Sequence, residues 1–440
     1  MKMNDRRSSS PVARGPVAAA SMPEEQLDAL VAVLDDVRHR GLRSRPEIIR
    51  STGLTRAVVA QRVSELLGRG LLVEGSLGPS TGGRAPRQLE FPAGAGHLLA
   101  ANLGATSIDV AVADLGGTIL AHRAEPADIA DGPERILGRV DLLFEEMATA
   151  VRDIPGQLWG VGLGVPGPVD FGRGYVVAPP IMPGWGEFPI RETFSERYDV
   201  PVWVDNDVNV MALGELRAGA ARGHDTIVFI KIGTGIGAGI IIDGKLHRGA
   251  QGSAGDVGHT QVVSDPDVIC RCGKVGCLEA LAGGAALARD ALALAHGGES
   301  PLLAGRLAEL GHLEASDVSW AASRGDAAST RLIAHAGNLV GEMLSSMVHI
   351  LNPSLIVIGG GVAQAGDRLL AAIREAVYRQ SPPLATRELE IRPSALGPQS
   401  GVVGVATMVT DELFSRACLA RWVGDGTPTG RPELALAAVG

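Results

Sequence analysis

The chain is poor in cysteine and contains no long apolar run. It has four cysteines in 440 residues, which is typical of an intracellular protein rather than of a disulfide-bonded secreted one. No apolar stretch approaches the ~18 residues that a membrane span needs, and the N-terminal region carries charge and serines instead of an apolar signal region. We therefore expect a cytoplasmic protein without a membrane partner, with about two to three domains.

Positive charge is scarce overall but gathers near the N-terminus. The chain has a formal net charge of −9, whereas residues 1–91 contain fourteen Lys or Arg and ten Asp or Glu, so the remaining residues carry −13. A basic segment attached to an acidic body indicates a module that binds polyanions. A solvated basic tail would give the same count.

The pattern in residues 23–92 predicts a winged helix-turn-helix domain. Residues 1–22 are rich in Ser, Ala, Pro and Arg and predict a disordered arm. Leu27 to Val37 recur at helical spacing, a short helix follows Pro46, and Gly53 with Thr55 forms a turn that caps a third helix. Two short strands follow, with a glycine-rich loop between them that contains Arg84. Such a domain reads DNA with its third helix, although a small protein-interaction module is the alternative.

Several residues of this module have side chains suited to DNA. The third helix would enter the major groove, and the loop would place an arginine against a minor groove. Each of these side chains could instead be an ordinary solvated residue. The candidates are Thr55, Arg56, Gln61, Arg62 and Arg84.

Three of the four cysteines lie within eight residues and follow a Gly-His pair. Thiolate and imidazole are the donors that Zn²⁺ prefers, and three thiolates with one imidazole complete a tetrahedral structural site. Two glycines, Gly273 and Gly276, would let the backbone fold tightly enough for the sulfurs to converge. The predicted ligands are His259, Cys270, Cys272 and Cys277. The alternative is a buried cysteine cluster with a bystander histidine.

From about Gly94 apolar strands alternate with helices and glycine turns, which indicates an α/β body over residues 93–425, followed by a flexible tail over 426–440. Three glycine-containing turns could bind a nucleotide: the first two could hold phosphate groups through backbone N–H groups, and the third would let a flat purine lie against the backbone. A β-hairpin is favoured for the first, and a tight strand-to-helix turn is the alternative for the third. Their residues are Gly104 and Thr106; Gly233, Thr234 and Gly235; and Gly359, Gly360 and Gly361.

Asn206 and Asp207 come directly after an apolar strand. The carboxyl end of a strand is where α/β proteins hold ligands, and an Asp there can accept a proton from a sugar hydroxyl. Asn and Asp are also favoured at helix N-caps, so capping is the alternative role.

Taken in this order, the segments resemble the ROK family of repressors, unassigned frames and sugar kinases. The resemblance covers about residues 24–420, and its most specific part is Gly258-His259 with the cysteine cluster and Glu279. It implies two ribonuclease-H-like lobes of the actin and hexokinase type behind a winged helix-turn-helix of the regulator branch. It also implies that Asp207 matches the kinases' catalytic base and that a sugar contacts Asn206, Asp207, Asp256, His259 and Glu279.

Two departures from the kinase pattern decide the expected function. Kinase members carry Asp-x-Gly-Gly-Thr-Lys in the first phosphate turn, where this chain has a neutral Asn102 and ends in Ser107. Mg²⁺ prefers anionic oxygen, and phosphoryl transfer relies on that metal. The usual Glu before Gly-His is the shorter Asp256.

We therefore expect a sugar-responsive repressor that binds operator DNA as a homodimer or homotetramer, with structural zinc and a sugar or sugar-phosphate effector. An ATP- and Mg²⁺-dependent hexose kinase with an accessory DNA-binding head is the first alternative. A regulator controlled by a transport protein is the second.

Overall fold

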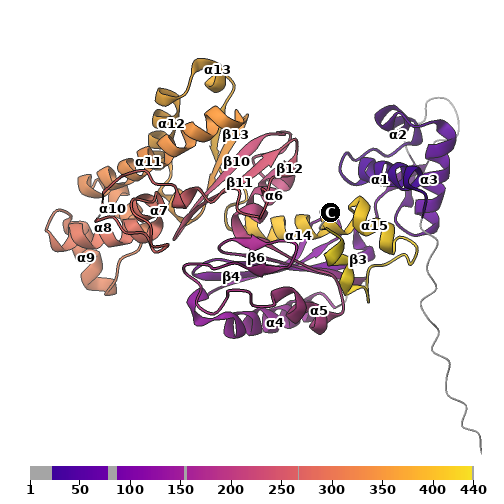
Figure 1. Ribbon diagram of the computed structural model, residues 1–440, viewed down its shortest axis with the longest axis horizontal. Coiled ribbons are helices and arrows are strands. Elements are labelled where there is room, and N and C mark those ends of the chain that lie inside the picture. The colour runs from indigo at the N-terminus through magenta and orange to yellow at the C-terminus, as the bar shows by residue number, and fades with distance from the viewer. Residues whose placement is uncertain (1–21, 78–86, 153–155, 266, 439–440) are drawn as a thin grey trace, which may run out of the picture. The chain divides into compact units, whose positions relative to one another are not determined.

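The computed structural model describes residues 22–77, 87–152, 156–265 and 267–438, and it divides the chain into two compact units (Figure 1). The first unit contains Met1–Glu90 and Leu419–Gly426, and the second contains Phe91–Cys418 and Thr427–Gly440. Within the described residues, no helix is both long enough and apolar enough to cross a membrane.

The first unit has the expected order of helices and strands. Its elements are α1 (Glu24–Arg38), α2 (Arg45–Thr52), α3 (Arg56–Gly68), β1 (Val73–Leu77) and β2 (Arg87–Glu90). The two strands pair antiparallel. Gly53 ends α2 in the left-handed conformation at φ 69°, and the Thr55 hydroxyl accepts a bond from the Val58 N–H to cap α3. The predicted turn and cap are therefore present.

The C-terminal region differs from the expected division into a body ending at 425 and a flexible tail over 426–440. Helix α15 (Arg416–Trp422) ends in the first unit, where Leu419 and Trp422 are fully buried and the Arg69 guanidinium donates to the Val423 carbonyl. The following residues return to the second unit, where the Thr429 hydroxyl donates to the Leu158 carbonyl at 3.0 Å. The 3₁₀ helix η6 (Pro432–Ala438) buries Leu434 and Ala435 completely. Buried apolar side chains anchor this segment to the units that it contacts. Its short length in the sequence does not predict that burial.

The second unit contains two five-stranded sheets, each the centre of a lobe. The first-lobe sheet has the order β5-β4-β3-β6-β9 and mixes antiparallel and parallel pairs. Helices α4 and α5 lie on one side of it and α14 on the other (Figure 1). The elements are β3 (Gly96–Leu103), β4 (Ser107–Asp114), β5 (Ile119–Pro126), β6 (Gln157–Val165), β9 (Val202–Asn206), α4 (Pro133–Ala150), α5 (Ile190–Tyr198) and α14 (Ser400–Leu413), with the small pair β7 (Val169–Asp170) and β8 (Tyr175–Val176).

The second-lobe sheet has the order β12-β11-β10-β13-β14 and packs against a large apolar cluster of helices. Its strands are β10 (Ile227–Ile232), β11 (Ile236–Ile242), β12 (Lys245–Leu246), β13 (Leu355–Gly359) and β14 (Glu390–Pro393). The helices are α7 (Glu279–Ala282), α8 (Gly284–His296), α9 (Pro301–Leu310), α10 (Ala315–Ser323), α11 (Ala327–Leu351), α12 (Asp367–Gln380) and α13 (Pro383–Thr386).

Two helices in direct contact connect the lobes. Helix α6 (Asp207–Ala218) packs on β10 and β11, and it contacts α14, which packs on β3 and β6. Gly214 lies against the Ser400 carbonyl and Gly404 against the Val210 carbonyl, so a side chain at either glycine would collide with the other helix's backbone. This close approach fixes the start of α6, which carries Asn206 and Asp207, beside both sheets.

Candidate functional site

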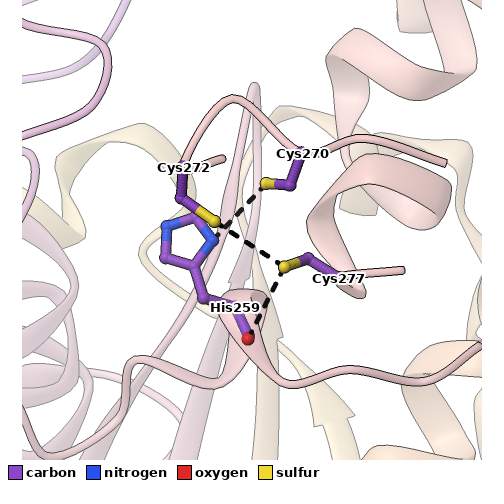
Figure 2. A group of neighbouring side chains, drawn as sticks. All are labelled: His259, Cys270, Cys272 and Cys277. Carbon is purple, nitrogen blue, oxygen red and sulfur yellow. Dashed lines mark hydrogen bonds between the residues drawn. The ribbon is translucent and has the colours of Figure 1, made fainter. Parts of the chain in front are cut away.

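The structure brings the four predicted metal ligands together (Figure 2). The donor atoms of His259, Cys270, Cys272 and Cys277 all lie within 4.8 Å of one another. The Cys272 and Cys277 sulfurs are 3.7 Å apart, and the Cys270 sulfur is 3.6 Å from the His259 Nδ1. Cys270 and Cys277 are buried.

These distances fit a tetrahedral metal centre. With Zn–S near 2.3 Å and Zn–N near 2.0–2.1 Å, tetrahedral angles place two sulfurs about 3.8 Å apart and a sulfur and a nitrogen about 3.6 Å apart. Burial, with the neighbouring sulfurs of Cys272 and Cys270 adding to it, raises the pKa of the Cys277 thiol to about 12. Thiols gathered this closely need a cation to ionise together, so the four residues could hold a metal ion such as zinc.

The loop that carries the cysteines folds through glycine, as expected. Gly273 and Gly276 have φ 83° and 69°, and a side chain at Gly276 would collide with the Val263 carbonyl. Helix α7 begins with Glu279, two residues after Cys277, so the metal loop positions that carboxylate. The Glu279 carboxylate accepts a bond from the Ile236 N–H at 3.2 Å and lies against Gly235, where a side chain would displace it. The metal loop and the second glycine turn are therefore directly connected.

Asn206 serves as the N-cap of α6, which was the alternative role considered for it. Its side-chain oxygen accepts bonds from the N–H groups of Val208 and Asn209 at 2.9 and 3.2 Å, and its amide donates to the Gly167 carbonyl at 2.8 Å. Asp207 is the first residue of α6, and its side chain is almost completely buried. A carboxylate at a helix N-terminus is electrostatically favoured.

Two cations that the sequence analysis did not single out face this strand end. The Lys231 ammonium forms an ion pair with Asp207, and the Arg248 guanidinium donates to the Asp205 carboxylate at 2.7 Å. Arg248 also lies over the Phe171 ring, 3.8 Å from its centroid. The available signal for Lys231 was a lysine inside the otherwise apolar strand Ile227–Ile232.

The three glycine turns differ in what their glycines do. Gly104 and Thr106 lie in the β3–β4 hairpin, as favoured from sequence. Thr234 lies between Gly233 and Gly235 in the β10–β11 hairpin. In the third turn, side chains at Gly359 and Gly360 would meet the Phe229 ring and the Ile232 backbone, and Gly361 begins the 3₁₀ helix η4 (Gly361–Ala365). Packing against β10 is thus sufficient reason for Gly359 and Gly360.

Asn102 is buried at the end of β3, between two glycines. Side chains at Gly164 and Gly401 would collide with its amide, and Gly401 belongs to the first turn of α14. The side-chain oxygen has no hydrogen-bond partner among the described residues. Asp256 is exposed at the start of the 3₁₀ helix η3 (Val257–His259), which ends at the candidate metal ligand His259.

The DNA-facing candidates fall into three groups. Thr55, Arg56 and Gln61 are exposed along α3. Arg62 is corrected: its side chain is only 4% exposed and forms an ion pair with Glu65 at 2.7 Å, because its position on α3 faces the core. Arg84 lies outside the described residues.

Comparison with known proteins identifies the family of the second unit. The family model for the ROK family matches residues 98–412. The chain belongs to the ROK family. This confirms the resemblance drawn from the metal loop and the glycine turns.

ROK relatives of two kinds resemble this chain. A xylose repressor of Caldicellulosiruptor bescii is 30% identical over 392 residues, covering 89% of this chain and 97% of the repressor. A glucokinase of Halalkalibacterium halodurans is 33% identical over 311 residues, covering 71% of this chain and 94% of the kinase.

Solved structures divide in the same way. A ROK family transcriptional regulator, a homologue of the E. coli Mlc protein, matches with a TM-score of 0.78 and 25% identity over 91% of this chain and 99% of that one. A ROK family glucokinase from Streptomyces griseus, in complex with glucose and AMPPNP, matches with a TM-score of 0.64 and 31% identity over 71% and 99%. The two five-stranded sheets of the second unit are thus the actin- and hexokinase-like ROK fold.

Proposed function

We propose that the protein is a sugar-responsive, DNA-binding transcriptional regulator, and most simply a repressor. One observation carries this proposal: the similarity to the xylose repressor extends over 89% of the chain, whereas the similarity to the glucokinase covers 71%. The part of the chain matched by the repressor but not by the glucokinase is about as long as the first unit, with its three helices and strand pair. A kinase of this fold does not need such a unit for phosphoryl transfer.

The first unit supplies the DNA-binding part of the proposal. Helix α3 follows a tight turn. Thr55 and Arg56 are exposed at its N-terminal end, and Gln61 is exposed on the side opposite its buried residues. Arg and Gln side chains on a helix in the major groove can hydrogen-bond base edges. Two copies of the chain would place two such helices on a palindromic operator, and phosphate contacts would make binding weaken steeply with salt.

The second unit supplies the sugar response. A zinc ion on His259 and the three cysteines would order the loop that precedes Glu279, so metal binding would stabilise part of the sugar site. Asn206, Asp207, Asp256, His259 and Glu279 are the proposed sugar ligands. Because α6 begins at Asp207 and packs against α14, a ligand at Asp207 has a direct route to the contact between the lobes.

Hexose phosphorylation by ATP is the second candidate function, favoured by the glucokinase relatives and the glycine turn Gly233–Gly235. Asn102 stands against it, since a neutral amide replaces the carboxylate that would organise Mg²⁺. We expect weak or absent turnover, a gain in any residual rate in Asn102→Asp, and loss of that rate in Asp207→Asn. A coupled assay giving about 1 s⁻¹ or more on any hexose would favour the kinase.

The direct test of DNA binding uses the full-length protein. Random DNA is selected for binding, and the enriched site is titrated by fluorescence anisotropy. Arg56→Ala should weaken binding by about 1–3 kcal/mol if the side chain contacts a base. Arg222→Ala removes an exposed arginine from the second unit and serves as the control. Failure to enrich any sequence, or equal affinities for the two variants, would contradict the proposal.

A further inference from the structure

Lys231 occupies an unusual place in the second-lobe sheet. It lies in β10 opposite Gly237 of β11 and Gly359 of β13, so both of its lateral neighbours lack side chains. Residues opposite each other in adjacent strands share a face of the sheet. The aliphatic part of the lysine side chain therefore has no neighbouring side chain on either adjacent strand at this position. Its Cε lies 3.3 Å from the position that a Cβ would take at Gly233.

The end of this side chain faces a carboxylate at the start of α6 and lies within electrostatic reach of a second carboxylate on strand β4. The ammonium forms an ion pair with Asp207, which directly follows β9. Its charge also acts on Asp109 of β4: burial raises the pKa of that carboxyl, and His122, Ser107 and Lys231 oppose the rise. The Lys231 side chain is 21% exposed, whereas that of Asp207 is 4% exposed, so the ammonium is the more accessible member of the pair.

A mostly buried ion pair is a poor device for stability alone, because removing two charges from water costs about as much as their attraction returns. The pair has a more direct effect on which ligands the site can bind. Asp207, Asp109 and Glu279 provide acceptors that suit the hydroxyls of a neutral sugar and repel an anion. Lys231 adds a cation next to Asp207, between that carboxylate and the Gly233–Gly235 turn. A ligand with a hydroxyl for Asp207 and an anionic group for Lys231 would satisfy both members of the pair.

We propose that Lys231 sets the charge class of the effector, and that the site around Asp207 and Lys231 binds a phosphorylated sugar in preference to the neutral sugar. This inference rests on the proposed sugar-responsive function and narrows it. The phosphate would replace the Asp207 carboxylate as the partner of Lys231, while the sugar hydroxyls keep Asp207 as an acceptor.

The test measures binding by isothermal titration calorimetry with the zinc-loaded, full-length protein. The probes are glucose and glucose 6-phosphate, N-acetylglucosamine and its 6-phosphate, and inorganic phosphate and ATP alone. We expect the wild type to bind one phosphorylated sugar at least about tenfold more tightly than its neutral partner, since a hydrogen bond to a charged group contributes this much. Inorganic phosphate and ATP should not reproduce this binding.

Variants assign the preference to Lys231. Lys231→Gln keeps a donor without the charge and should lose the preference for the phosphorylated sugar. Lys231→Arg should retain it, and Lys245→Met removes an exposed lysine from β12 as the control. A wild type that prefers the neutral sugar, or a Lys231→Gln variant that keeps the preference while circular dichroism shows it folded, would overturn the inference and leave the sugar response intact. If no sugar of either kind binds, the proposed function fails with it.

Discussion

Single cysteine substitutions can distinguish the clustered candidate metal ligands from the remaining cysteine. Cys272 is the most exposed of the three clustered thiols, and its sulfur lies 3.7 Å from that of Cys277. Replacing one donor leaves an incomplete coordination set, whereas Cys418 is buried far from the cluster in sequence.

We predict one zinc ion per wild-type chain and loss of that ion in Cys272→Ser. Structural zinc contributes folding free energy directly, so the melting temperature of the variant should fall by at least about 5 °C. Elemental analysis and thermal unfolding measure both effects, and Cys418→Ser should keep its zinc. Wild-type protein purified without chelator that contains no metal would contradict this prediction.

Glu412 is a second residue with a distinct electrostatic environment. Burial raises the pKa of its carboxyl to about 7, with Asp411 and Asp205 adding to the rise and Arg248 and Arg191 opposing it. The Arg248 guanidinium is 3.9 Å from this carboxylate and is already bonded to Asp205. A carboxyl whose folded pKa is raised binds its proton more tightly in the native state, so its contribution to stability is lost as pH rises from about 4.5 to 7.

Glu412→Gln should therefore be more stable than the wild type at pH 8, by up to about 3 kcal/mol, and nearly equal to it at pH 5. Melting temperatures at pH 5, 6, 7 and 8 test this. Glu375→Gln, at an exposed carboxylate, should show no such crossover. Parallel curves for the wild type and Glu412→Gln would show that Glu412 does not titrate in this range.

At the scale of elements, the sequence was most informative where local chemistry determines structure. Capping residues and helical spacing located α1, α2 and α3, and glycine turns located the β3–β4 and β10–β11 hairpins. The metal site was predictable because its donors lie close together in sequence. The three cysteines fall within eight residues, and His259 precedes them by a short distance.

Features that depend on distant packing were not predicted. The orientation of α3 decides that Arg62 points into the core, and a pattern of charge alone does not reveal it. The Lys231–Asp207 pair joins a residue of the second-lobe sheet to the first residue of α6, and its formation depends on how the lobes meet through α6. The contribution of Leu419–Gly426 to the first unit likewise requires a return of the chain across more than three hundred residues.

Residues Leu419–Gly426 are therefore part of the proposed DNA-binding unit. Trp422→Ala should destabilise this unit by about 3–5 kcal/mol, because it removes a fully buried aromatic side chain. Hydrogen exchange in α1–α3 of the full-length protein should accelerate, and operator affinity should fall. Leu436→Ala, at an exposed position of η6, is the control. Unchanged exchange in α1–α3 would show that the segment does not support them.

For the whole molecule, the central question is whether this ROK chain regulates transcription or phosphorylates a sugar. The repressor and the glucokinase relatives named above share the fold of the second unit. The xylose repressor and the Mlc homologue match about nine-tenths of this chain, whereas the glucokinase of Halalkalibacterium halodurans matches 71% of it. The neutral Asn102 and the additional unit with exposed side chains on α3 favour regulation.

The most direct measurement titrates the full-length protein with its selected operator in the presence of ATP and Mg²⁺, with and without each sugar and sugar phosphate, while ADP release is followed in the same sample. We predict that one ligand changes operator affinity by at least about fivefold, the usual lower range of coupling between sites, with no ligand-dependent ADP release. Steady ADP release at about 1 s⁻¹ or faster with operator affinity unchanged by every ligand would contradict the account.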